Sequence, residues 1–252
     1  MKLIDLHCHL LPQLDDGSSS PEETRAMLAG AAKDGVSIIA ATSHAGGVAV
    51  ASYLETFSVW HKIAQEEFGI LLVPGMEYDY GDLVKLRQRG GENDLILLNN
   101  NGTLMVDFVI GYLPSDWTNL TNWQQAKQVK QIVAVHPERL FPDAVTIGRK
   151  LSEAGIYLQI NAGSLLGDYG PAIRRQAYRL LDAGLCHFIA GDTHSSRHPI
   201  WRMAAVREKL LKRYGENYTT TWLYENPQRI LNGTCPHQVR PRLKWYQRLW
   251  YR

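Results

Sequence analysis

Two short motifs in this sequence pair a histidine with a second potential metal ligand two residues away. His7 and His9 flank Cys8 near the start of the chain, and Asp192 and His194 flank Thr193. Alternate residues of an extended strand share one face, so each pair can present two side chains to one point. Imidazole and carboxylate groups together suit a borderline divalent ion such as Zn, Mn or Fe. A lone His-x-His motif is a weak signal, and two hydrogen-bonded core histidines are the alternative.

Five further potential ligands follow apolar runs elsewhere in the chain: Asp16, His44, Glu77, Asp107 and His136. Most of them have a simple structural explanation when taken alone, such as a turn at Asp16. Asp107 is different, because it interrupts an apolar run where a buried carboxylate is costly unless it is paired or bound to a metal. The nine donors together exceed the ligands that one ion takes, so the sequence predicts more than one metal.

The elements that must position these residues follow from the alternation of apolar runs with helix-like stretches, which is typical of parallel βα units. The expected strands are 3–6, 36–41, 70–73, 96–98, 103–106, 132–135, 156–160 and 187–190, and the expected helices are about 20–33, 50–67, 115–129, 143–154, 171–183 and 199–213. The first helix has the clearest boundaries, with Ser20 as its cap, Pro21 at its first position and Gly35 after its end. The carboxyl ends of parallel strands meet on one face of a barrel, where we expect the nine donors to gather.

Composition places the chain among ordinary globular proteins. It has 252 residues, of which 45% are hydrophobic and 21% charged, and no stretch approaches the ~20 apolar residues of a membrane span. Charged residues occur too early at the N-terminus for a secretory signal, and the three cysteines are odd in number and widely spaced. Both features favour a cytoplasmic protein with reduced thiols. Without the five basic residues of 237–252, the chain has 22 basic and 25 acidic residues, so we expect no nucleic-acid partner.

The order of these motifs resembles a known superfamily. The run from Ile4 to Pro12, followed by Asp15-Asp16-Gly17 and later by Gly191-Asp192-Thr193-His194, is similar to the polymerase and histidinol phosphatase (PHP) superfamily. The resemblance covers about residues 3–232 and is specific to the bacterial tyrosine-protein phosphatases of capsule and exopolysaccharide loci. It implies a distorted (β/α)7 barrel of the TIM type, with a trinuclear centre that usually contains Mn²⁺; Fe and Zn are the alternatives.

The resemblance also implies a role for each donor. His7, His9, Glu77 and Asp192 would hold one ion; Glu77 would bridge to a second ion held with Asp107 and His136; Asp16, His44 and His194 would hold the third. Arg139 and Arg197 match phosphate-binding positions, although a surface ion pair would also explain Arg139. These two arginines, with Asp192 and His194, are the predicted catalytic residues, and either His194 or His198 could donate a proton. The family usually has glutamate at position 107, so the shorter Asp107 predicts a looser second site.

The expected activity is hydrolysis of phosphotyrosine on a polysaccharide-biosynthesis kinase by attack of a metal-bridged hydroxide. The main alternative is a PHP phosphoesterase that acts on a small ester such as histidinol phosphate. A non-catalytic metal-binding regulator of the kinase is an alternative of another class, and a barrel nuclease or amidohydrolase fits the Asp-x-His motif less well. A cysteine-dependent phosphatase is excluded, because no cysteine is followed by arginine at the Cys-x5-Arg spacing.

The sequence divides into a barrel domain, residues 1–236, and a basic aromatic tail, residues 237–252. Residues 240–252 combine five basic residues with two tryptophans and two tyrosines, and could form a short amphipathic helix on an anionic membrane surface at the inner face of the membrane. Packing of the tail on the barrel and an oligomer contact are the alternatives. The oligomeric state is not predicted.

Overall fold

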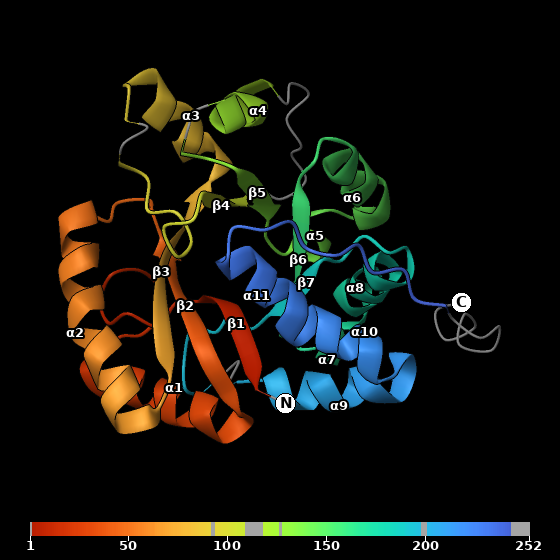
Figure 1. Cartoon of the computed structure of the whole chain (residues 1–252), viewed down its shortest axis with the longest axis horizontal. Helices are drawn as coiled ribbons and strands as arrows, with labels where there is room; N and C mark the ends of the chain where they lie inside the picture. The colour runs from red at the N-terminus through yellow and green to blue at the C-terminus, as the bar shows by residue number, and fades with distance from the viewer. Residues whose placement is uncertain (1, 92–93, 109–117, 126–127, 198–200, 243–252) are drawn as a thin grey trace.

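A computed structural model describes residues 2–91, 94–108, 118–125, 128–197 and 201–242. Seven parallel strands lie in chain order: β1 (Leu3–Cys8), β2 (Val36–His44), β3 (Leu71–Asp79), β4 (Thr103–Asp107), β5 (Gln131–Ala134), β6 (Tyr157–Asn161) and β7 (Phe188–Ala190). The two edges approach each other, since the His9 N–H donates to the Thr193 carbonyl and the Asp192 N–H to that of His7. This nearly closed arrangement confirms the predicted distorted (β/α)7 barrel (Figure 1).

The helices surround this barrel (Figure 1). They are α1 (Pro21–Asp34), α2 (Val50–Phe68), α3 (Tyr80–Gln88), α4 (Thr118–Gln125), α5 (Pro137–Leu140), α6 (Ala144–Glu153), α7 (Ala162–Leu166), α8 (Pro171–Asp182), α9 (Met203–Tyr214), α10 (Glu216–Thr220), the π-helix η2 (Thr221–Glu225) and α11 (Asn226–Leu231). A large apolar cluster joins strands to helices, and a smaller one joins several strands to Ile230 and Leu231 of α11. The polar residues of the candidate site therefore rest on a packed apolar scaffold.

The boundaries of α1 follow the local sequence as predicted. The Ser20 hydroxyl accepts a hydrogen bond from the Glu23 N–H, and Pro21 is the first helical residue. Gly35 ends the helix with a φ of 80°, a left-handed conformation in which a side chain is disfavoured. The Ser20 cap and Pro21 thus fix the far end of the loop between β1 and α1, which carries Asp16.

The predicted strand at 96–98 is wrong. Within the described residues this segment forms only one antiparallel bridge, from Leu98 to Thr103, although residues 96–98 are buried. Asn99 and Asn100 adopt positive φ angles, which turn the chain, and the Asn101 side chain donates to the Leu231 carbonyl at 2.8 Å. The apolar run is thus a buried turn that contacts the end of α11, and apolar composition alone does not distinguish such a turn from a strand.

Other predicted elements differ mainly at their ends. The helix expected at 115–129 spans Thr118–Gln125 among the described residues, and the one expected at 199–213 begins at Met203. The short helices α5 and α7 were not predicted, and neither were α3, α10, η2 and α11. Residues 243–252 of the predicted tail lie outside the described residues, so membrane contact stays a prediction; before them, the Arg242 N–H donates to the Tyr218 hydroxyl.

Candidate metal centre

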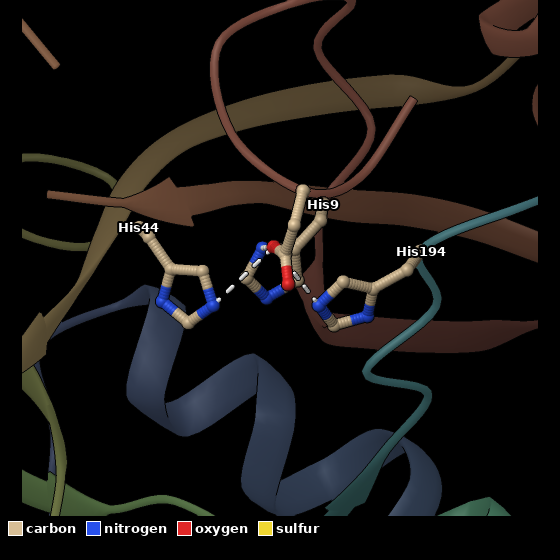
Figure 2. A group of neighbouring side chains, drawn as sticks. His9, His44 and His194 are labelled. Atoms are coloured by element: carbon tan, nitrogen blue, oxygen red, sulfur yellow. Dashed lines mark ion pairs between the residues drawn. The ribbon is translucent and has the colours of Figure 1, made fainter. Parts of the chain in front are cut away.

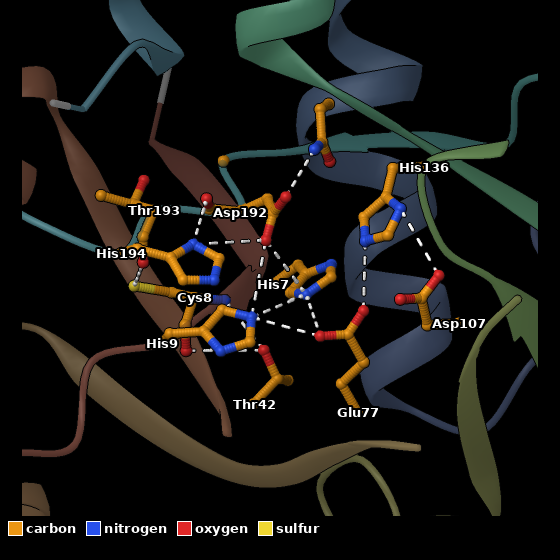
Figure 3. A network of polar contacts seen from close by, with 12 residues as sticks. His7, Cys8, His9, Thr42, Glu77, Asp107, His136, Asp192, Thr193 and His194 are labelled. Carbon is orange, nitrogen blue, oxygen red and sulfur yellow. Dashed lines mark hydrogen bonds and ion pairs between the residues drawn. The ribbon is translucent and has the colours of Figure 1, made fainter. Parts of the chain in front are cut away.

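Four predicted ligands from three strands meet in a buried cluster (Figure 3). His7 lies in β1 and His9 directly follows this strand, while Glu77 lies in β3 and Asp192 follows β7. The Nε2 atoms of His7 and His9 lie 3.2 Å apart, each 3.2 Å from Glu77 Oε2 and 3.5 Å from Asp192 Oδ1. Their side chains are at most 2% exposed. Two nitrogen and two oxygen donors therefore face one point.

A second group shares Glu77 with the first. Glu77 Oε1 lies 3.1 Å from His136 Nε2, while His136 Nδ1 lies 3.8 Å from Asp107 Oδ1. His7, Glu77 and His136 offer three ligand atoms within 4.8 Å of one another, and Asp107 is outside that group. The structure thus brings Asp107 next to His136, at a distance longer than a hydrogen bond, in line with the shorter side chain at this position.

A third group is open to solvent (Figure 2). His9, Asp16, His44 and His194 offer ligand atoms within 4.8 Å of one another. Asp16 Oδ1 lies 3.5 Å from Nε2 of both His44 and His194. The exposed fractions of the Asp16, His44 and His194 side chains are 69%, 38% and 25%. His44 Nδ1 also lies 3.2 Å from Glu77 Oε2, so the three groups form one continuous centre.

Hydrogen bonds from outside the cluster orient two of the imidazoles. His9 Nδ1 lies 2.7 Å from the Asp15 carboxylate, and His7 Nδ1 lies 3.1 Å from the Gln159 carbonyl oxygen. Both partners accept, so each Nδ1 donates and each Nε2 lone pair faces the cluster, as in metal-binding histidines. Asp15 also accepts the His44 N–H at 2.9 Å and links the buried cluster to the open group. In the sequence Asp15 looks like part of a turn, so its function was missed.

The close approach of Gly17 to His9 explains the path of the loop that carries Asp15 and Asp16. A Cβ atom at Gly17 would lie 2.2 Å from the His9 carbonyl oxygen, which no side chain tolerates. The Gly17 N–H donates to Asp15 Oδ1 at 3.0 Å, and the Ser18 N–H donates to the His9 carbonyl. The Asp-Asp-Gly sequence therefore folds back on the strand end, and this places Asp16 above the cluster.

The cluster strongly favours positive charge. Burial alone would lower the pKa of His9, but Asp15, Asp192 and Glu77 raise it well above the ordinary value. Burial is likewise outweighed at Glu77, whose pKa is held well below its usual range by His7 and His136, and at His136, whose pKa rises to about 9. Asp107 differs, because burial and the nearby Glu77 raise its pKa.

The donor set fits divalent cations. Two imidazole lone pairs that face each other at 3.2 Å repel unless a cation lies between them and the carboxylates. Three imidazole nitrogens lie 3.2 Å from Glu77 Oε2, and in the described part of the chain Asp107 Oδ1 and His136 Nδ1 are buried without a hydrogen-bond partner. Such buried, unpaired groups are costly in a protein interior and are relieved by coordination to a metal. The arrangement suits several ions that share Glu77.

Two predicted ligands adopt strained backbone conformations. His136 has a φ of 34° and Asp192 a φ of 53°, a region that non-glycine residues rarely occupy. The Asp192 side chain is held by Asn161, whose amide donates to Asp192 Oδ2 at 2.6 Å. Strain of this kind is common where a side chain must be aimed at a site. Asn161 and Gln159 alternate at the end of β6, a pattern that could have identified them as supporting residues.

The two predicted phosphate-binding arginines differ in their surroundings. Arg139 in α5 lies at the cluster: its guanidinium donates to Asp192 Oδ2 at 2.5 Å and stacks on the Tyr169 ring at 4.5 Å. Arg197 is exposed after β7, near Glu23 of α1. Among the described contacts Arg197 has none to the ligand cluster, so its predicted role stays a prediction. Tyr169 was not anticipated from the sequence.

Comparison with known proteins agrees with this geometry. The chain is 29% identical over 239 residues to the tyrosine-protein phosphatase YwqE of Bacillus subtilis, covering 92% of each chain. A crystal structure described as one of the metal-dependent tyrosine phosphatases YwqE, from Bacillus subtilis, and CpsB, from Streptococcus pneumoniae, superposes with a TM-score of 0.84 at 27% identity, over 96% of this chain and 99% of that one. Histidinol phosphate phosphatase from Lactococcus lactis shares the fold alone, with a TM-score of 0.51 at 16% identity over 84% of this chain and 93% of that one.

The described residues include no helix with the length and apolarity of a membrane span.

Residues 3–232, nearly the whole barrel, match the family described as capsular polysaccharide synthesis, CpsB/CapC. This match includes all nine predicted ligands and both arginines. The chain therefore belongs to the CpsB/CapC family of capsular polysaccharide synthesis proteins.

Proposed function

We propose that this chain is a metal-dependent tyrosine-protein phosphatase that hydrolyses phosphotyrosine on a polysaccharide-biosynthesis kinase in the cytoplasm. The observation that carries the proposal is the continuous set of three ligand groups that share His7, His9 and Glu77 and lie beside Arg139. The names of the relatives support phosphotyrosine as the substrate. The three free cysteines, two of them buried, are compatible with a reducing compartment.

Bound divalent ions would supply activation of water at neutral pH and neutralisation of phosphoryl charge. We favour Mn²⁺, with Fe and Zn as alternatives. The ligands would be His7, His9, Glu77 and Asp192 for the first ion, Glu77, Asp107 and His136 for the second, and Asp16, His44 and His194 for the third.

The chain's own residues would then orient the ester. Arg139 can turn from Asp192 toward a phosphoryl oxygen, because its head is one-third exposed and its stack on Tyr169 fixes its plane. His194, at the open side, would give a proton to the leaving phenolate only while its Nε2 is not bound to the third ion. The other candidate donor, His198, lies outside the described residues. Tyrosinate has a pKa near 10 and leaves with little help.

The test is hydrolysis of phosphotyrosine, phosphoserine and histidinol phosphate by the full chain, with Mn²⁺, with EDTA and as the His136→Ala variant. Hydrolysis that prefers phosphotyrosine, needs the metal and is lost in the variant is expected. A preference for histidinol phosphate would instead favour the small-ester enzyme. Bound metal without hydrolysis of any ester would favour the non-catalytic regulator.

A matched control separates loss of chemistry from loss of fold. His61 lies on α2, away from the cluster, and its Nδ1 contacts the Leu72 carbonyl. His61→Ala removes an imidazole of the same kind and should leave phosphotyrosine hydrolysis within about twofold of the unaltered chain, since surface changes are usually small. Equal losses in both variants would contradict the placement of the site.

A further inference from the structure

One segment of the molecule is far more basic than the rest. Residues 171–214, which include α8 and α9, contain nine Lys or Arg and three Asp or Glu residues. The remainder of the chain has 18 basic and 22 acidic residues, so its formal charge is −4 against +6 for this segment. A local field of this kind attracts anionic ligands.

The basic segment is connected to the site through the turn between α7 and α8. Tyr169 in this turn lies under the Arg139 guanidinium. The neighbouring Asp168 accepts two hydrogen bonds from Arg202, both at 3.1 Å, which fixes the turn to the start of α9. Arg174 packs over the same turn, since a Cβ at Gly167 would lie 3.3 Å from Arg174 Cδ. The basic surface therefore begins where the predicted phosphate-binding arginine is held.

Part of this positive charge forms no ion pair with a carboxylate among the described residues. Arg202, Arg207 and Arg213 each pair with a carboxylate. No ion pair between described residues includes Arg174, its exposed neighbour Arg175, or Lys209. Burial and then the positive charge of Arg174 lower the pKa of Lys209, against a smaller opposing effect of Asp168, which is already paired with Arg202; Arg174 and Lys209 therefore repel each other. An anion placed between them would relieve that repulsion.

The surface lacks the apolar component of a membrane-binding face. The exposed large apolar side chains in the described part of the chain are Leu54, Val59, Leu71 and Tyr224, and none of them lies on α8 or α9. Peripheral membrane helices normally combine basic residues with such side chains. An acidic polypeptide needs only the charges, and it can extend from the site along the adjoining turn.

We propose that Arg174, Arg175 and Lys209 form a docking surface for acidic residues that flank the phosphotyrosine in the substrate protein. The inference rests on the proposed phosphatase function and adds a sequence preference to it. The docked segment would contribute binding energy next to the site without touching the reacting phosphate. The surface should therefore affect KM for an acidic peptide and leave kcat for small esters unchanged.

The experiment compares two synthetic phosphotyrosine peptides of equal length, one with glutamate flanks and one with serine flanks, and free phosphotyrosine. For the unaltered Mn²⁺-loaded chain, the KM of the acidic peptide should be about fivefold lower at low salt, because exposed ion pairs each contribute modestly. Arg174→Gln/Lys209→Gln should abolish this preference while kcat/KM for free phosphotyrosine is unchanged. The matched control is Lys62→Gln/Arg89→Gln, on α2 and at the end of α3, two helices that lie away from α8 and α9 in Figure 1, and it should keep the preference.

The outcomes separate the two proposals. Hydrolysis of phosphotyrosine without a preference between the peptides would overturn the docking surface and leave the proposed function intact. If no ester is hydrolysed, the proposed function fails, and fluorescence anisotropy of the two labelled peptides still tests docking by the same pair of variants. Binding to vesicles of anionic lipid that the Arg174→Gln/Lys209→Gln variant loses, with peptide kinetics unaltered, would assign the surface to a membrane and overturn the proposal.

Discussion

The candidate centre has a buried half and an open half that are built from the same kinds of side chain. In the buried half, His7, His9, Glu77 and Asp192 are almost completely enclosed. In the open half, Asp16, His44 and His194 reach into solvent, with exposed fractions of 69%, 38% and 25%. Glu77 and His9 belong to both through their contacts.

The difference shows how one donor set can serve two purposes. Buried carboxylates and imidazoles are stable only if their charges are compensated, so the buried half should bind its ions tightly and lose stability without them. The exposed side chains of the open half lose little hydration and are readily reached by water, so an ion bound there is accessible to a phosphate ester. We therefore expect changes in the two halves to differ in size and in whether added metal restores activity.

Glu77→Gln should have the largest effect, because Glu77 lies at hydrogen-bond distance from four imidazoles and is a ligand at two of the three proposed ion positions. We expect a loss of about a thousandfold in kcat/KM for phosphotyrosine, as for other buried electrostatic groups at active sites. Activity should not return at millimolar Mn²⁺. Steady-state kinetics with metal analysis of the purified variant tests this. Recovery of activity with excess Mn²⁺ would contradict the expectation that the buried half binds its ions tightly.

Asp16→Asn should have a smaller effect that metal can reverse. The Asp16 carboxylate is 69% exposed and lies 3.5 Å from His44 and His194, so its loss weakens one ion position and leaves the buried cluster in place. We expect a loss of about tenfold at limiting Mn²⁺. A Mn²⁺ titration should restore most of the activity. A loss as large and irreversible as that of Glu77→Gln would show that the two halves are not separable.

The strand-end ligands could be predicted because their chemistry follows from local sequence. His7-x-His9 and Asp192-x-His194 have the period of a strand, and a parallel barrel brings strand ends together. The contacts of Asp15 and Tyr169 depend on how loops fold over the strand ends, which no local pattern encodes. The false strand at 96–98 has the same origin: its burial is set by the distant α11, through Asn101 and Leu231.

Asp107→Glu tests the second proposed ion position, where the carboxylate stops short of the neighbouring histidine. Asp107 Oδ1 stops 3.8 Å from His136 Nδ1, and both atoms are buried without a hydrogen-bond partner. Glutamate would extend the carboxylate by ~1.5 Å, one carbon–carbon bond. The Mn²⁺ concentration for half-maximal activity should fall, by at most about tenfold. An increase would mean that the pocket is shaped for aspartate.

The smallest effect on activity is expected at a buried histidine outside the centre. His187 is 5% exposed, and its Nδ1 accepts the Leu158 N–H at 3.0 Å, so it is neutral in the folded protein. Burial lowers its pKa to about 4, whereas carboxylates raise the pKa of His136 to about 9. The comparison indicates that the carboxylates around His136, rather than burial, make it accept positive charge.

His187→Asn should leave phosphotyrosine hydrolysis at pH 7 unchanged and alter only the dependence of stability on pH. Since the unfolded histidine titrates near pH 6.5 and the folded one near 4, its contribution is complete above pH 6.5 and is lost as the pH falls toward 4. The loss is at most ~3.4 kcal/mol, at 1.36 kcal/mol per pKa unit over the shift from 6.5 to about 4. Urea unfolding at pH 7 and pH 4.5 should therefore show a steeper decline for the unaltered chain than for the variant. Parallel declines would mean that burial does not hold His187 neutral, and His187 would then no longer serve as the contrast that separates burial from the carboxylates around His136.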